Sequence, residues 1–228
     1  MIVENEDMGT PFEATCLQVD NPRGLILFAV GRGGQPKRHM ALLSRFFDAG
    51  YSVIAPHFDL LAPGLVSKAD LALRVSHLSA ALDRVSPDGL PLFGVGHSIG
   101  GTALMILAGA RAHTRAGEMI EAPRKLAFRK LGLLAPAVAF FQAPHCLDKV
   151  TAETRLWVGE NDTITPPEQM LILEKGLPAA CAFRLERLAE TGHFTFMDEL
   201  PPGITDRHPD RATFLASIRA SLLDHIEG

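Results

Sequence analysis

Two kinds of hydrophobic pattern alternate along the chain. Short runs of β-branched and aliphatic residues are typical of strands, and the longer stretches between them repeat apolar residues at helical spacing. The strand-like runs are residues 12–19, 25–30, 51–55, 90–95, 131–138, 154–158 and 180–185. The helical stretches are residues 37–49, 67–82, 99–112, 166–175 and 209–226. This alternation predicts an α/β fold with a mostly parallel sheet of about seven strands and helices on both faces.

Local signals refine three of these connections. Residues 21–24 (Asn-Pro-Arg-Gly) have strong turn chemistry and predict a hairpin between the first two strands. Ser67, followed by Asp70, predicts a capped helix start. The apolar face that follows consists of Leu71, Val75, Leu78 and Leu82. The basic stretch between Arg111 and Lys130 is interpreted as a solvated connecting helix with loops.

Length and composition favour one globular domain over residues 1–228, with residues 1–11 as a candidate disordered N-terminus. Hydrophobic residues make up 47% and charged residues 21%, which excludes disordered, collagen-like and coiled-coil classes. The net charge of -4 argues against nucleic acid or an anionic membrane as a partner. Three cysteines without CxxC spacing indicate reduced thiols in a cytoplasmic protein.

Membrane insertion and export are also not expected. The longest apolar stretch, residues 131–141, contains Pro136 and is shorter than the roughly 17 to 25 residues of a spanning helix. Glu4, Glu6 and Asp7 occupy positions where a secretory signal would carry positive charge.

The most informative segment is residues 96–100, which read Gly-His-Ser-Ile-Gly. A Gly-x-Ser-x-Gly sequence between an apolar strand and an apolar helix is typical of a nucleophile elbow, with Ser98 at its tip. The alternative is a glycine-rich turn that binds phosphate at a helix N-terminus. That alternative is disfavoured because no Lys-Ser or Lys-Thr follows the glycines.

A serine nucleophile needs a base and a carboxylate that orients the base. Asp162 follows the strand-like run 154–158, and His193 lies in the loop after the next strand. The order Ser98, Asp162, His193 is the chain order of an α/β-hydrolase triad. Read singly, Asp162 is equally a turn former or helix cap, and His193 a surface residue.

Other acids and histidines near the expected active edge are alternative candidates for the same roles. Glu160 is the second candidate for the orienting acid and Asp59 a weaker one. His57 and His97 are the other histidines of this region. His97 is not assigned as the base, because a residue beside a serine on a tight turn points elsewhere.

The sequence resembles the α/β-hydrolase superfamily, and most resembles its compact dienelactone-hydrolase-like members. The resemblance spans residues 12–226 and rests on residues 96–101, on 159–162 followed by two prolines, and on 192–194 (Gly-His-Phe). Dienelactone hydrolases usually carry cysteine as the nucleophile. Serine at position 98 therefore favours a serine esterase, lactonase or thioesterase.

The resemblance also implies an oxyanion hole and an open cleft. Its two amides would come from Ile99 and, in the loop of residues 31–34, from Arg32. The alternative for Arg32 is a substrate carboxylate, which guanidinium binds in a bidentate way. Residues 142–153 are too few for the helical cap of larger relatives. Candidates for an apolar rim, each with core packing as the alternative, are Phe58, Leu60, Leu61, Phe140, Phe141 and Phe194.

Together these features predict a serine hydrolase that acts on a small acyl substrate through an acyl-enzyme, with His193 as base and Asp162 as its orienting acid. No metal or organic cofactor is implied, and a homodimer is left open. Two alternatives share the fold: a non-catalytic ligand-binding protein and an acyltransferase with the same triad.

Overall fold

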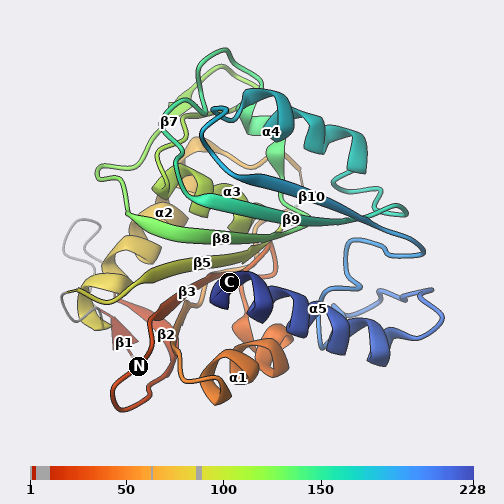
Figure 1. Cartoon of the computed structure of the whole chain (residues 1–228). Coiled ribbons are helices and arrows are strands. Elements are labelled where there is room, and N and C mark those ends of the chain that lie inside the picture. Colours follow the sequence, from red (N-terminus) through yellow and green to blue (C-terminus); the bar gives the residue numbers. More distant parts are fainter. Residues whose placement is uncertain (1, 4–10, 63, 86–88) are drawn as a thin grey trace.

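Strands from the whole length of the chain form one mixed sheet (Figure 1). The computed structural model describes residues 2–3, 11–62, 64–85 and 89–228. Within them the sheet has eight strands, in the order β1-β2-β4-β3-β5-β8-β9-β10. They are β1 (Ile2–Val3), β2 (Phe12–Leu17), β3 (Leu25–Ala29), β4 (Ser52–Pro56), β5 (Leu92–His97), β8 (Phe128–Leu134), β9 (Glu153–Gly159) and β10 (Phe183–Leu188). From β4 to β10 all neighbours pair in parallel, which confirms the predicted α/β fold.

The prediction of a hairpin between β2 and β3 is wrong. β2 pairs antiparallel with β4, so that Ala14 lies opposite Pro56, and β3 lies beyond β4 in the sheet. Every residue of β3 is buried, which suits a central strand with a partner on each edge. β2 begins with alternating burial and suits a position near the edge. The amide of Arg23 in the turn donates to the Gly50 carbonyl at 2.9 Å, so the turn joins the start of β4 instead.

Helices cover both faces of the sheet, as predicted. They are α1 (Met40–Asp48), α2 (Lys68–Val85), α3 (Ile99–Leu107), α4 (Leu171–Gly176) and α5 (Arg211–Glu227), with 3-10 turns η1 (Pro36–His39), η2 (Val138–Phe141) and η3 (Pro167–Met170). Figure 1 shows α1 and α5 on one face and α2 and α3 on the other. The predicted cap of α2 is confirmed: Asp70 Oδ2 accepts from the Ser67 amide at 2.9 Å, and Ser67 Oγ accepts from the Asp70 amide at 3.1 Å.

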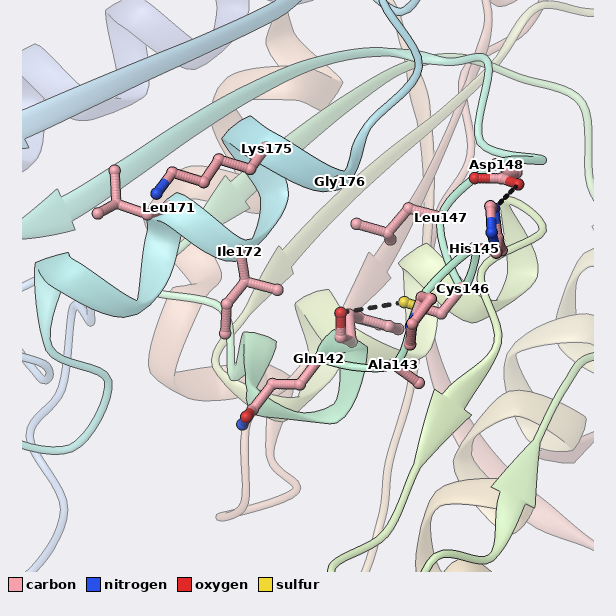
Figure 2. A pocket seen from close by; sticks show the side chains of 12 residues that line it. Gln142, Ala143, His145, Cys146, Leu147, Asp148, Leu171, Ile172, Lys175 and Gly176 are labelled. Carbon is pink, nitrogen blue, oxygen red and sulfur yellow. Dashed lines mark hydrogen bonds and ion pairs between the residues drawn. The ribbon is translucent and has the colours of Figure 1, made fainter.

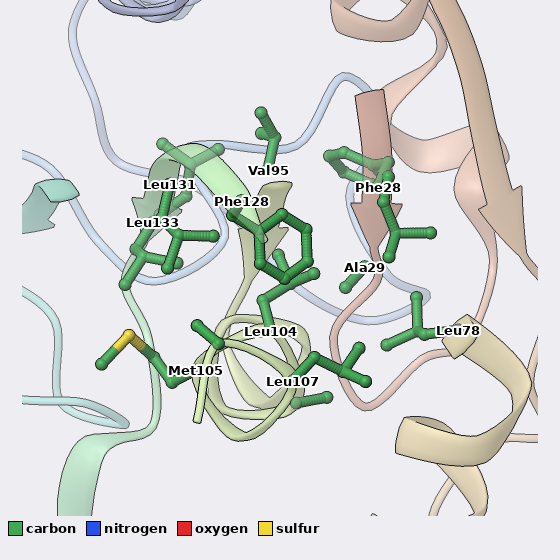
Figure 3. Packing of buried hydrophobic residues seen from close by; sticks show 14 of the residues in the cluster. Phe28, Ala29, Leu78, Val95, Leu104, Met105, Leu107, Phe128, Leu131 and Leu133 are labelled. Carbon is green, nitrogen blue, oxygen red and sulfur yellow. The ribbon is translucent and has the colours of Figure 1, made fainter. Parts of the chain in front are cut away.

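Helix α3 packs into the middle of the core (Figure 3). All nine of its residues are buried, between the sheet and α2. Leu104 and Met105 lie against side chains from β5 and β8, and Leu78 of α2 closes the other side. The helix ends at Leu107, short of the predicted residue 112, because the amide of Ala110 turns back onto the Met105 carbonyl at 2.9 Å. The first turn of α3 follows directly after the end of β5 and is buried in the same core.

The segment between Arg111 and Lys130 contains no helix, which corrects the earlier interpretation. It forms a small antiparallel pair, β6 (Ala112–His113) with β7 (Met119–Ile120), and then enters β8. Residues 135–152, which join β8 to β9, contain only the short η2 and turns, as expected of a fold without a helical cap. The expected disorder of residues 1–11 concerns positions that lie mostly outside the described residues. In the described part of the chain, none of the helices combines the length and apolarity needed to cross a membrane.

Candidate active site

Ser98 occupies a sharp turn between the end of β5 and the start of α3. Its φ of 55° and ψ of -126° are a conformation that L-residues rarely adopt, at a cost of about 1–3 kcal/mol. Backbone hydrogen bonds hold it there: the Ser98 amide donates to the Leu134 carbonyl at 2.9 Å, and its carbonyl accepts from the Gly101 amide at 3.0 Å. The sequence expectation of a strained serine at a strand-to-helix turn therefore matches the local backbone.

The glycines beside Ser98 allow this turn to pack closely. A Cβ on Gly100 would lie 2.1 Å from the Ala29 carbonyl oxygen of β3. A Cβ on Gly96 would lie 2.8 Å from the Leu104 side chain and 2.9 Å from the Gly101 amide nitrogen. Backbone atoms leave no room for either, so the Gly-x-Ser-x-Gly spacing is required by the turn itself.

Ser98, His193 and Asp162 lie in one hydrogen-bonded line. His193 Nε2 is 3.0 Å from Ser98 Oγ, and His193 Nδ1 is 2.7 Å from Asp162 Oδ2. All three side chains are buried. They come from the carboxyl ends of β5, β9 and β10, which the parallel sheet brings to the same edge. The arrangement can move a proton from the hydroxyl to the imidazole.

The second oxygen of Asp162 shapes its own loop. Asp162 Oδ1 accepts from the amides of Ile164 and Thr165, both at 2.8 Å, while Thr165 Oγ1 donates to Oδ2 at 2.7 Å. Asp162 therefore forms a turn, as the alternative interpretation predicted, and also hydrogen-bonds to His193. Thr165 was not anticipated from the sequence, since a threonine three residues after an aspartate is a common turn pattern.

These contacts keep the carboxyl of Asp162 ionised. Its burial raises the pKa, but the hydrogen bonds and charge of His193 and the donors of Thr165 outweigh burial, and the pKa lies below its ordinary value. A carboxylate is therefore present at neutral pH beside Nδ1 of the imidazole.

His97 lies beside His193 and contacts the main chain of the loop that carries it. Its Nε2 is 3.0 Å from the His193 carbonyl oxygen, and the two rings are 4.9 Å apart. His97 is fully buried, and this burial, together with the neighbouring His193 and His39, holds its pKa well below the usual value. A neutral His97 whose Nε2 carries the proton donates to the main chain of the loop that presents His193.

The loop of residues 31–34 lies directly against Ser98. A Cβ on Gly31 would lie 3.3 Å from the Ser98 Cβ. The Arg32 guanidinium donates to the carbonyls of Ala62 and of Gly64, the latter at 2.8 Å, so main-chain oxygens occupy it. Ile99, the other residue expected at the oxyanion hole, follows Ser98 as the first residue of α3.

A cavity of about 1010 Å³ opens at Ser98. Among the expected rim residues only Phe140 lines it, whereas Phe58 and Phe141 are buried in the core. Leu60 is 73% exposed, and Leu61 packs against the core. The apolar wall consists instead of Leu65, Val66, Ile99, Phe140, Ile164 and Ile172, and residues 113–115 of the β6–β7 segment form part of the opposite side. Apart from Phe140, the residues of these walls were not expected there, because they come from segments far apart in sequence.

Phe194 borders a separate hollow of about 530 Å³ on the other side of His193. The Phe194 ring lies edge-on to the His193 ring at 5.2 Å. It therefore fixes one side of the imidazole and is not part of the wall around Ser98.

The weaker candidates lie away from this line of side chains. Glu160 and Asp59 are exposed. His57 Nε2 is 2.8 Å from Thr15 Oγ1, which ties His57 to β2. Across the described ranges, no group of three or more His, Cys, Asp or Glu side chains is arranged to hold a metal ion.

A further hollow of about 590 Å³ lies between α4 and the loop after η2 (Figure 2). Its only sulfur, Cys146, is buried and donates to the Phe141 carbonyl at 3.0 Å. Burial raises the pKa of the Cys146 thiol, which leaves it protonated at neutral pH. The hydrogen bond between His145 Nδ1 and Asp148 Oδ2, at 3.0 Å, lies on the exposed side. This hollow therefore has no activated nucleophile.

No family model and no curated protein sequence matches the chain. Several solved structures do. Est1E from Butyrivibrio proteoclasticus, in a structure with ferulic acid bound, is 15% identical and has a TM-score of 0.66 over 100% of both chains. Dienelactone hydrolase from Anabaena variabilis is 18% identical, with a TM-score of 0.66 over 100% of this chain and 95% of that one. The thermophilic esterase Est2 from Thermogutta terrifontis is 14% identical, with a TM-score of 0.69 over 99% of this chain and 90% of that one. The chain therefore has the α/β-hydrolase fold that its sequence motifs led us to expect.

Proposed function

We propose that the protein is a serine hydrolase that cleaves a small carboxylic ester, lactone or thioester through an acyl-enzyme. The observation that carries the proposal is the unbroken line from Ser98 Oγ through His193 to Asp162, placed at the opening of a large cavity. Structural neighbours that are named esterases and a dienelactone hydrolase support the same reaction class.

In the first half of the reaction, Ser98 Oγ attacks the substrate carbonyl while His193 Nε2 takes its proton. The negative charge on the former carbonyl oxygen is stabilised by the amides of Ile99 and Arg32. His193 then gives the proton to the leaving oxygen or sulfur, and the bond between it and the acyl carbon breaks. The ester formed on Ser98 is the acyl-enzyme.

In the second half, a water molecule takes the place of the leaving group. His193 removes a proton from the water as the water oxygen attacks the acyl carbon. It then gives that proton to Ser98 Oγ while the bond between Oγ and the acyl carbon breaks and the carboxylic acid leaves. Asp162 stays ionised throughout and stabilises the imidazolium that forms in each half. Its low pKa suits this role.

The experiment compares the wild type with Ser98→Ala on p-nitrophenyl butyrate, a lactone and an acyl thioester, with a fluorophosphonate probe as the label. We expect the wild type to be labelled at Ser98 and the variant to lose the label and at least about 10³-fold in kcat. Peptide mapping of the label identifies the residue. Labelling at another residue, or full activity of Ser98→Ala, contradicts the proposal.

A further inference from the structure

Arg74 is a charged side chain that lies almost completely inside the protein. It is 1% exposed and comes from the middle of α2. Its guanidinium carbon lies 4.5 Å from the centre of the Phe58 ring. An arginine at this depth requires polar partners, because an unpaired buried charge is strongly destabilising.

The partners of Arg74 are consecutive carbonyls of the loop beside Ser98. Arg74 Nη1 donates to the carbonyl oxygens of Val30 at 3.2 Å and Gly31 at 3.1 Å, and Nη2 lies 3.5 Å from that of Arg32. The Gly31 carbonyl also accepts from the Gly34 amide at 3.1 Å. One side of the loop is therefore fixed through its oxygens.

Because the peptide bond is planar, the direction of each carbonyl also fixes the direction of the next residue's amide. Within a trans peptide unit the C=O and the N–H point in opposite directions, and the Gly31 carbonyl shares its unit with the Arg32 amide. An oxygen that points at Arg74 leaves the N–H of Arg32 on the opposite side of the loop. Gly31 packs against Ser98 and His97, with a Cβ position 3.3 Å from the Ser98 Cβ. The loop is held between Arg74 and the serine.

We propose that Arg74 is a positioning residue for the oxyanion hole, which holds residues 30–32 so that the Arg32 amide faces the carbonyl oxygen attacked by Ser98. The proposal rests on the proposed function and goes beyond it, because Arg74 touches neither Ser98 nor the cavity and acts only through the loop. A guanidinium matches this task, since its fixed fork of donors can hold several carbonyls in one geometry.

The charge of Arg74 adds to this effect. Burial lowers its pKa to about 10, despite the nearby Asp70, so the side chain remains a cation at neutral pH. A cation on the carbonyl side of a peptide withdraws electron density and makes its N–H a stronger donor. Neutral replacements therefore lose both the geometry and the polarisation.

The test measures kcat and KM on p-nitrophenyl butyrate for the wild type, Arg74→Met, Arg74→Lys and Lys130→Met. The inhibition constant of phenylboronic acid, which forms a tetrahedral adduct with an active serine, reports on the oxyanion hole. Lys130 is the matched control: it is a buried cation that also donates to a carbonyl, that of His225 at 2.9 Å, but at the far end of the sheet. Thermal melting shows how much each variant loses in stability.

We expect Arg74→Met to lower kcat by about 10²-fold with KM within about 2-fold, and to weaken the boronate by a similar factor. Arg74→Lys should recover part of the loss, because an ammonium still donates to one or two of the carbonyls. Lys130→Met should lower the melting temperature and leave kcat unchanged. A loss of kcat in Arg74→Met that is absent from Lys130→Met cannot result from a general loss of stability.

A folded Arg74→Met with wild-type kcat overturns the proposal, as does an equal loss of kcat in Lys130→Met. If Arg74→Met does not fold, Arg74→Lys decides: wild-type kcat and boronate binding overturn the proposal, and a lower kcat at unchanged KM supports it. A wild type that cleaves no ester and takes no fluorophosphonate overturns the proposed function, and this proposal with it. The two failures are thus distinguishable.

Discussion

The two ends of the parallel sheet place similar side chains in different surroundings. At the carboxyl end, His193 joins Ser98 to Asp162. At the opposite end His225 is also buried, beside Glu153. There His225 Nε2 is 3.0 Å from the Leu131 carbonyl oxygen, and its Nδ1 lies 3.7 Å from the half-exposed Glu153 carboxylate. Burial of a histidine beside an acid does not make a catalytic site.

The two histidines differ in the hydrogen-bond partner of Nε2. Nε2 of His193 faces a hydroxyl at the opening of a cavity, whereas Nε2 of His225 faces a main-chain carbonyl, which has no proton to give up. Lys130 next to His225 donates to that residue's carbonyl, near the end of α5, where a cation also complements the helix dipole. The geometry of one end suits proton transfer, whereas the hydrogen bonds at the other end join α5 to the sheet.

The same substitution at both ends separates these roles most strongly. Asp162→Asn should lower kcat by about 10⁴-fold, equivalent to about 5.5 kcal/mol in the barrier, because an amide stabilises neither the required tautomer nor the imidazolium. Glu153→Gln, the matched change at the opposite end, should keep kcat within about 2-fold. Steady-state kinetics on p-nitrophenyl butyrate measures both. Equal losses in the two variants contradict the distinction between the ends.

Residues tied to the main-chain path were the ones that could be predicted. The Gly-x-Ser-x-Gly spacing is required by backbone contacts of Gly96 and Gly100, so a local pattern locates Ser98. Asp162 and His193 follow β9 and β10 in chain order, and parallel pairing brings their strand ends to one edge. Strand order and the Gly-x-Ser-x-Gly motif together were enough to predict that the three side chains meet.

What could not be predicted depends on packing between distant segments. The turn chemistry of residues 21–24 predicts a hairpin. In the structure β2 pairs with β4 instead, and the fully buried β3 takes a central position in the sheet. Ile164 and Ile172 line the cavity because α4 and η3 pack against η2. The hydrophobic pattern of the sequence does not predict this contact. Arg74 lies in a helical stretch between Leu73 and Val75, and only the fold shows that it reaches the loop beside Ser98.

A histidine that lacks the reactive partner of His193 should affect stability instead of catalysis, and His39 tests this. It is fully buried, with its ring 5.1 Å from that of Phe28 and 5.3 Å from that of His97. Burial lowers its pKa from 6.5 to about 4, although Asp198 acts in the opposite direction and Arg38 in the same one. Between these values the unfolded chain binds more protons than the folded one, so the free energy of unfolding falls as pH falls.

His39→Phe should remove this dependence. From pH 7 to pH 5 the wild type should lose about 2 kcal/mol of stability through His39, and the variant should lose about 2 kcal/mol less. Urea unfolding at the two pH values measures the difference, and activity at pH 7 serves as the control for the site. Parallel losses in wild type and variant would show that His39 is not held neutral by burial.

The smallest expected effect distinguishes the two acids at the end of β9. Glu160 lies two residues before Asp162, but its side chain is exposed and its amide donates to the Leu188 carbonyl at 2.9 Å. Asp162 alone of the two is hydrogen-bonded to His193. Glu160→Gln should therefore keep kcat/KM within about 2-fold across pH 6 to 9, because an exposed charge at this position is screened by solvent. If Glu160→Gln instead reproduces the loss expected for Asp162→Asn, the orienting acid in solution is Glu160, and the loop must rearrange when substrate binds.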